Sequence, residues 1–116
     1  MEKMYISIAQ DESVEEQAHK DLKAKVAEQS DNPDIMNAIL ECLKALKWSS
    51  RILATSLKML KSLALTSEPH KQKLLTSVTR KELRTFADNF FSHEDIQADA
   101  LILIALFKEA KYENMV

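Results

Sequence analysis

Glu16 and His19 have the Glu-x-x-His spacing that places a carboxylate and an imidazole on one face of a helix. In di-iron four-helix bundles this pair supplies metal ligands, but that chemistry needs two copies of the motif and further glutamates on facing helices. The sequence contains one copy. We therefore predict a solvated, charged helix face at this position, with no metal and no cofactor.

The remaining nucleophiles and titratable residues lack the surroundings that catalysis requires. Cys42 lies in an apolar stretch, which favours a buried and inert thiol over a nucleophile oriented by a histidine. Residues 93–95, His-Glu-Asp, point in different directions on a helix and are explained as a helix start. His70 follows Pro69, so we expect it on the surface in a first turn. No catalytic residue is predicted, and the protein is expected not to be an enzyme.

Glycine is absent from the 116 residues, of which 46% are hydrophobic. Glycine serves the positive-φ positions of hairpins, bulges and phosphate-binding loops, so its absence argues against sheet-rich folds, P-loops and Rossmann motifs. With one cysteine and no signal peptide, we expect a reducing, cytoplasmic setting. The longest apolar run, 100–107, is far shorter than the roughly 20 residues that span a bilayer, so we expect a soluble chain with no membrane partner.

Capping signals followed by helical spacing predict four helices, over 14–29, 33–65, 69–91 and 93–112. The first of these signals is a capping box from Ser13 to Glu16. Before the first of them, Met4, Ile6 and Ile8 alternate with polar residues, which predicts an extended or frayed arm over 1–12. The expected fold is an all-α, four-helix bundle-like single domain over 1–116.

The second predicted helix, 33–65, is unusually long and central. Its apolar positions follow a 3-4 spacing without interruption, and one continuous helix explains that best. The positions are Met36, Ile39, Leu43, Leu46, Ser50, Leu53, Leu57, Leu60 and Ala64. The alternative is a break at 48–50, where the sequence has neither glycine nor proline and no capping acid. Ser50, a polar residue in the apolar seam, is a candidate position for specifying register.

Two features modify the last two predicted helices. Residues 79–82, Thr-Arg-Lys-Glu, form a second capping box that predicts a bend near Thr79. The C-terminal helix is apolar nearly all round, which places it in the centre of the fold or in a subunit interface. A strand over 100–107 is the alternative, and the alanine and leucine content argues against it.

Charge is segregated along the chain, with net −6 over 1–41, +8 over 42–81 and −4 over 82–116. Projected on one helix, five cations form a basic stripe: Lys44, Lys47, Arg51, Lys58 and Lys61. In one interpretation the acidic first helix or an acidic flank of the last helix lies against this stripe, and acidic residues such as Glu12, Glu15 and Glu16 pair with it. In the other, the stripe binds an anionic partner.

These observations predict a small, non-enzymatic interaction or regulatory protein that associates with a protein partner or with itself as a homodimer. The candidate interface residues are Leu53, Leu57, Leu60, Leu103 and Phe107. Two alternatives remain open. One is a nucleic-acid-associated regulator that uses the basic stripe, and the other is an immunity or inhibitor protein that binds one target. The total charge of −2 and the lack of an aromatic stacking platform argue against nucleic acid.

Overall fold

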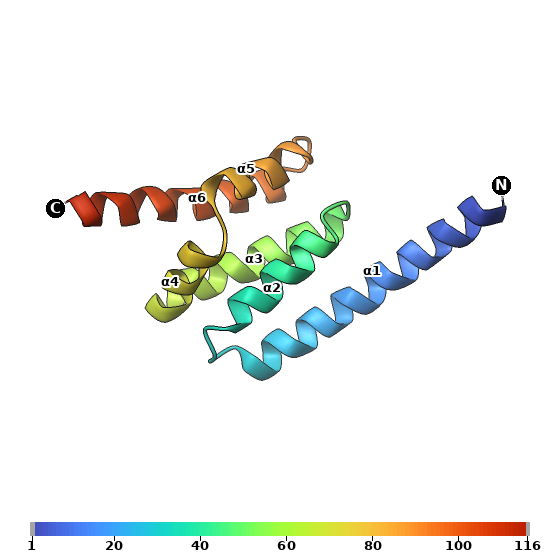
Figure 1. Cartoon of the computed structure of the whole chain (residues 1–116), viewed down its shortest axis with the longest axis horizontal. Helices are drawn as coiled ribbons and strands as arrows, with labels where there is room; N and C mark the ends of the chain where they lie inside the picture. The colour runs from blue at the N-terminus through green and yellow to red at the C-terminus, as the bar shows by residue number, and fades with distance from the viewer. Residues whose placement is uncertain (1, 116) are drawn as a thin grey trace.

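The computed structural model describes the backbone of residues 2–115 and the side chains of residues 13–108. In this part of the chain the secondary structure is entirely helical (Figure 1), which confirms the all-α prediction. Residues 2–115 form six helices where four were expected. They are α1 (Glu2–Gln29), α2 (Ile35–Ala45), α3 (Ser50–Thr66), α4 (Glu68–Ser77), α5 (Arg80–Asp88) and α6 (Glu94–Met115).

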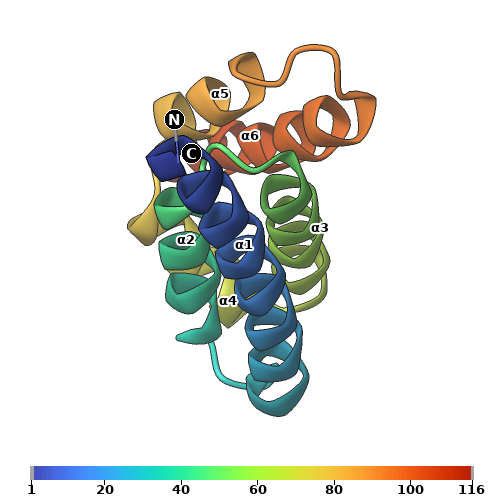
Figure 2. The same ribbon diagram turned by 90° about the vertical axis from the view of Figure 1, so that its right-hand side faces the viewer.

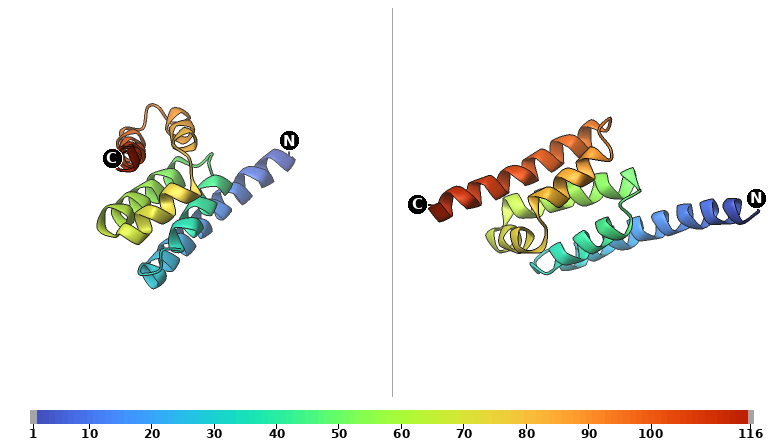
Figure 3. Two further views of the ribbon diagram at one scale, coloured as in Figure 1. Left: turned by 60° about the vertical axis from the view of Figure 1, so that its left-hand side comes forward. Right: turned by 45° about the horizontal axis from the view of Figure 1, so that its top comes forward.

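Helix α3 lies at the centre and contacts α1, α2, α4 and α6. The helices form three layers, with α1 on one side of the α2–α3 hairpin and the α5–α6 pair on the other (Figure 1). Viewed from the end, α1 runs in front of α2 and α3, and α6 crosses above them (Figure 2). The molecule is elongated, 60 × 31 × 20 Å, because α1 and α6 extend past the core in opposite directions (Figure 3).

The core is a single apolar cluster to which every helix contributes. Met36, Ile39 and Leu43 of α2 are fully buried, and the same side of the hairpin continues with Leu53, Leu57 and Leu60 of α3. The apolar repeat read from the sequence is therefore real. Its residues belong to two antiparallel helices that present one shared apolar face.

The prediction of one continuous helix over 33–65 is wrong, because α2 ends at Ala45 and α3 begins at Ser50. Ser49 has an extended backbone, and its hydroxyl accepts a hydrogen bond from the Ile52 amide at 3.1 Å. That bond satisfies one of the free N–H groups at the start of α3. The hydroxyl alone provides the cap, so no acidic residue is needed. Ser50, expected in the middle of a seam, is the first residue of α3.

The bend expected near Thr79 is a complete break between α4 and α5. Thr79 and Glu82 form the predicted capping box, with the Thr79 hydroxyl accepting from the Glu82 amide and the Glu82 carboxylate accepting from the Thr79 amide, both at 3.1 Å. The hydrogen bonds to the carboxylate lower the pKa of Glu82. The sequence signal was correct, and it marks the start of a separate helix.

The N-terminal prediction is also corrected. Helix α1 begins at Glu2, so the backbone of residues 2–12 is helical and not an extended arm, and Ser13 lies inside the helix instead of capping it. The C-terminal helix is confirmed and runs from Glu94 to Met115. Among residues 2–115 none has a positive φ, so the turns are built without the conformations for which glycine is needed.

Candidate interaction surfaces

Glu16 and His19 do not form a joint site. Glu16 is exposed and pairs with Lys20 at 3.7 Å, whereas His19 is buried with its Nε2 atom 2.9 Å from the Thr55 hydroxyl. Burial lowers the pKa of His19, and the nearby cations Arg51 and Lys23 lower it further, which favours the neutral imidazole. His19 therefore attaches α1 to α3.

Glu15 provides a second polar link between the same two helices. Its carboxylate accepts a hydrogen bond from the Ser49 hydroxyl at 2.7 Å. Ser49 thus accepts from the Ile52 amide and donates to Glu15, so one side chain both caps α3 and holds α1.

The surface position predicted for His70 is wrong, because the side chain is 4% exposed. Its Nε2 atom lies 2.7 Å from the Ser30 carbonyl oxygen, and its Nδ1 atom lies 2.7 Å from the Ser67 hydroxyl. A carbonyl oxygen can only accept, so Nε2 carries the proton, and in the neutral ring Nδ1 accepts from Ser67. His70 thereby connects the α1–α2 loop to the start of α4. The sequence carries no signal for this contact.

Cys42 is half-buried on α2, and burial raises the pKa of its thiol. A raised pKa keeps the sulfur protonated and reduces its nucleophilicity. The sequence predicted a buried thiol, whereas the side chain is only partly buried, and its inertness stays a prediction.

The five cations of the basic stripe are divided among elements by the break before α3. Lys44 is on α2, Lys47 is in the turn, and the other three are on α3. Two of the five lie against carboxylates of other helices, since Lys44 Nζ is 3.4 Å from Glu82 and Lys61 Nζ is 2.7 Å from Asp99. Lys61 therefore contacts the acidic flank of the last helix, one of the two partners considered above. Glu15 and Glu16 of the first helix contact Ser49 and Lys20 instead, and Glu12 lies outside the described side chains.

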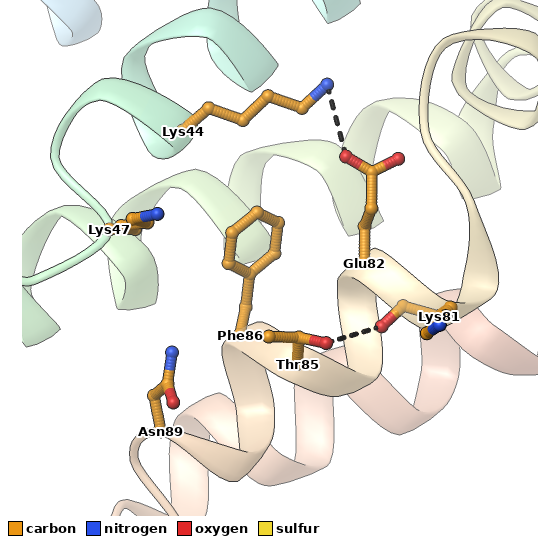
Figure 4. Close-up of a pocket in the computed structure, with 7 residues that line it drawn as sticks. All are labelled: Lys44, Lys47, Lys81, Glu82, Thr85, Phe86 and Asn89. Carbon is orange, nitrogen blue, oxygen red and sulfur yellow. Dashed lines mark hydrogen bonds and ion pairs between the residues drawn. The ribbon is translucent and has the colours of Figure 1, made fainter.

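A pocket of about 420 Å³ lies between the end of α2 and α5. It brings Lys44 and Lys47 of the stripe together with Lys81, which the sequence reasoning did not connect to them. Figure 4 shows the Phe86 ring between the two stripe lysines and Asn89, with Glu82 beside Lys44. Within residues 13–108, Lys47 and Lys81 form no ion pair. The pocket thus presents cationic side chains around an aromatic floor.

The predicted interface residues lie mainly inside the chain. Leu53, Leu57, Leu60 and Leu103 are fully buried in the core, and Phe107 is half-buried against it. The fold's own helices cover these side chains, which corrects their assignment as contact residues for a second copy.

The apolar residues that do reach solvent on α6 are their neighbours. Ala98, Leu101, Ile102 and Ala105 are exposed, and we refer to these four residues as the outer face of α6. Leu101 is 60% exposed and Ile102 39%. Their spacing of three and four residues places them on one side of the helix, opposite Leu103. The sequence showed that α6 is apolar all round, but it did not show which side the core would cover.

Among the side chains of residues 13–108, the other large exposed apolar residues occur singly. Val14 is on α1, Leu65 at the end of α3, and Trp48 and Phe91 in turns. Single exposed apolar residues are common on protein surfaces, whereas a continuous apolar face marks a contact surface.

Comparison with protein-family models, with curated proteins and with solved structures finds no match to this chain. Among the described residues, none of the helices combines the length and apolar character needed to cross a bilayer.

Proposed function

We propose that the protein is a small, non-enzymatic interaction protein that associates with a second copy of itself through the outer face of α6. The observation that carries this proposal is the unbroken apolar character of that face. From Ala98 to Ala105, every exposed position of the helix is alanine, leucine or isoleucine.

Removing this face from water is favourable at about 25 cal/mol per Å² of apolar surface. The opposite face of α6 is already used, because Ile96, Ala100 and Leu103 pack into the core. A helix that is apolar on two sides is stable in water when both sides are covered. The chain itself covers one side of α6, and the proposed partner covers the other.

The experiment is a measurement of solution mass by light scattering or sedimentation over a range of concentrations. The wild type is expected to approach twice the chain mass of 13.2 kDa, and Leu101→Lys is expected to return it to the single-chain mass. Leu65→Lys is the matched control, because Leu65 is 57% exposed but lies on α3. That variant should keep the wild-type mass.

A wild type that remains at the single-chain mass up to near-millimolar concentrations would contradict self-association. A dimer unaffected by Leu101→Lys would retain self-association and reject α6 as its surface. Circular dichroism of each variant distinguishes dissociation from unfolding.

The lysine pocket supports a second candidate, a regulator that binds an acidic segment of a partner protein. Lys47 and Lys81 lie at the pocket with no ion pair to the described side chains, and Phe86 offers an apolar contact between them. Lys47→Gln with Lys81→Gln should abolish binding of an oligo-glutamate peptide. Duplex DNA is the comparison ligand, with affinity falling by a log–log slope of about −0.9 per phosphate contact if it binds. Tight DNA binding at physiological salt would favour the nucleic-acid alternative.

A further inference from the structure

The exposed positions of α6 are arranged symmetrically about a point between Leu101 and Ile102. Moving outward, the next exposed pair is Ala98 and Ala105, at equal distances from that point. The pair after that is Asp95 and Lys108, again exposed and equidistant. Within these three pairs, each residue thus has a counterpart of matching size or opposite charge, whereas the exposed Glu94 has another glutamate as its counterpart in the sequence, at position 109.

This symmetry is what a two-fold interface between antiparallel helices requires, because such an interface brings each residue to the level of its counterpart in the other copy. We propose that two copies of the chain pair through α6 in antiparallel orientation, with the two-fold axis passing between Leu101 and Ile102. The inference rests on the proposed self-association and specifies its geometry.

The size of the side chains suits this register. Ala98 of one copy faces Ala105 of the other, and facing alanines let the helix axes approach to about 8 Å, the short end of the usual range. The leucine and isoleucine of both copies then form the central apolar layer around the axis. The partly exposed Ile102 and the more exposed Leu101 are covered together.

Charge favours the antiparallel orientation over the parallel one. The first turn of α6 carries Glu94 and Asp95, both exposed, and Lys108 is exposed toward the other end. Antiparallel pairing places Asp95 at the level of Lys108 of the second copy, with Glu94 one residue further out. Parallel pairing places the four carboxylates together and the two lysines together, which is repulsive at both ends. Antiparallel helix dipoles also attract each other.

The surface is accessible without rearrangement of the chain. Helix α6 lies in an outer layer, on the side of the α2–α3 hairpin opposite α1 (Figures 1 and 3). The four residues of its outer face are exposed to solvent in the single chain.

Disulfide trapping of single-cysteine variants tests the register. Cys42→Ser provides the background, and Ala98→Cys and Ala105→Cys are made separately, one of them carrying an affinity tag. In the proposed geometry a mixture forms the tagged–untagged disulfide, because the two positions face each other. Ala98→Cys alone does not cross-link, since its two copies lie about 10 Å apart along the axis, beyond the roughly 7 Å reach of a disulfide. Leu65→Cys is the exposed control and should remain uncross-linked.

The outcomes separate this inference from the proposed function. A dimer in which Ala98→Cys cross-links with itself and not with Ala105→Cys would show parallel pairing and overturn the register. A dimer that gives no cross-link at either position would move the interface to another surface. A wild type that is monomeric under the same conditions would reject the proposed self-association itself.

Discussion

The two outermost helices, α1 and α6, cover opposite sides of the same α2–α3 hairpin, but they are attached to it differently. Over its described side chains α1 buries one large apolar residue, Leu22, and adds polar links through Glu15 and His19. Helix α6 buries a full apolar face that includes Ile96 and Leu103, together with one ion pair to α3.

The solvent-facing sides of the two helices differ in polarity, because that of α1 is mostly polar and that of α6 is apolar. The exposed positions of α1 are mostly charged or amide residues, such as Glu16, Lys20 and Asp21, and they pair with one another along the helix. The outer face of α6 carries no charge between its two alanines. The polar exposed side of α1 is therefore well hydrated, whereas the exposed side of α6 leaves apolar surface in water. For this reason we assign the contact surface to α6.

The largest expected change in the free energy of unfolding distinguishes the buried face of α6 from its outer face. Leu103→Ala removes a fully buried side chain and should lower the free energy of unfolding by about 2–5 kcal/mol. Leu101→Ala, two positions away on the outer face, should change it by less than about 0.5 kcal/mol at concentrations where the protein is monomeric. Urea denaturation at low protein concentration measures both, and equal costs would contradict the assignment of inner and outer faces.

The next effect compares the ion pairs of the two helices. Asp99 is 5% exposed, so Asp99→Asn leaves Lys61 without its partner and should cost about 1–3 kcal/mol of stability. Glu16→Gln breaks the exposed Glu16–Lys20 pair on α1 and should cost at most about 0.5 kcal/mol. If the two variants unfold at the same urea concentration, the Lys61–Asp99 pair contributes no more to stability than an exposed ion pair.

The smallest expected change is in the pH dependence of stability, and it concerns His19, which attaches α1 to α3. Its pKa in the folded protein lies below the ordinary 6.5, so the unfolded chain binds a proton more readily than the native state. Stability from this residue is therefore complete above that pH and declines as the pH falls toward the folded pKa. His19→Gln can still hydrogen-bond to Thr55 and should reduce the decline, whereas His93→Gln, an exposed control, should leave it unchanged. Unfolding curves between neutral and mildly acidic pH measure the difference.

Local signals in the sequence predicted the helical class, the Thr79 capping box and the apolar repeat of the hairpin. The break at Ser49 was missed because the repeat continues in phase across it, and a serine hydroxyl capped the helix without an acidic residue. The burial of His19 and His70 depends on partners more than 30 positions away in the chain, at Thr55 and Ser30, so local patterns cannot reveal it.

The candidate interaction surfaces were harder to predict from the sequence than the helices, because they depend on tertiary packing. The sequence separated the basic segment from the acidic ones, but the pairing of Lys44 with Glu82 and of Lys61 with Asp99 follows from the packing of α5 and α6. The outer face of α6 could not be chosen in advance, because leucine and isoleucine occupy both sides of that helix and only the packed hairpin selects between them.

Antiparallel pairing through α6 is tested most directly by an isotope-filtered NOE experiment on a mixture of ¹³C-methyl-labelled and unlabelled protein, which detects contacts between copies alone. We expect intermolecular NOEs between the methyl group of Ala98 and that of Ala105, with further NOEs among Leu101 and Ile102 at the two-fold axis. Intermolecular NOEs that arise from another surface, or a spectrum without them at concentrations where the wild type should be dimeric, would contradict the assignment of α6 as the contact helix.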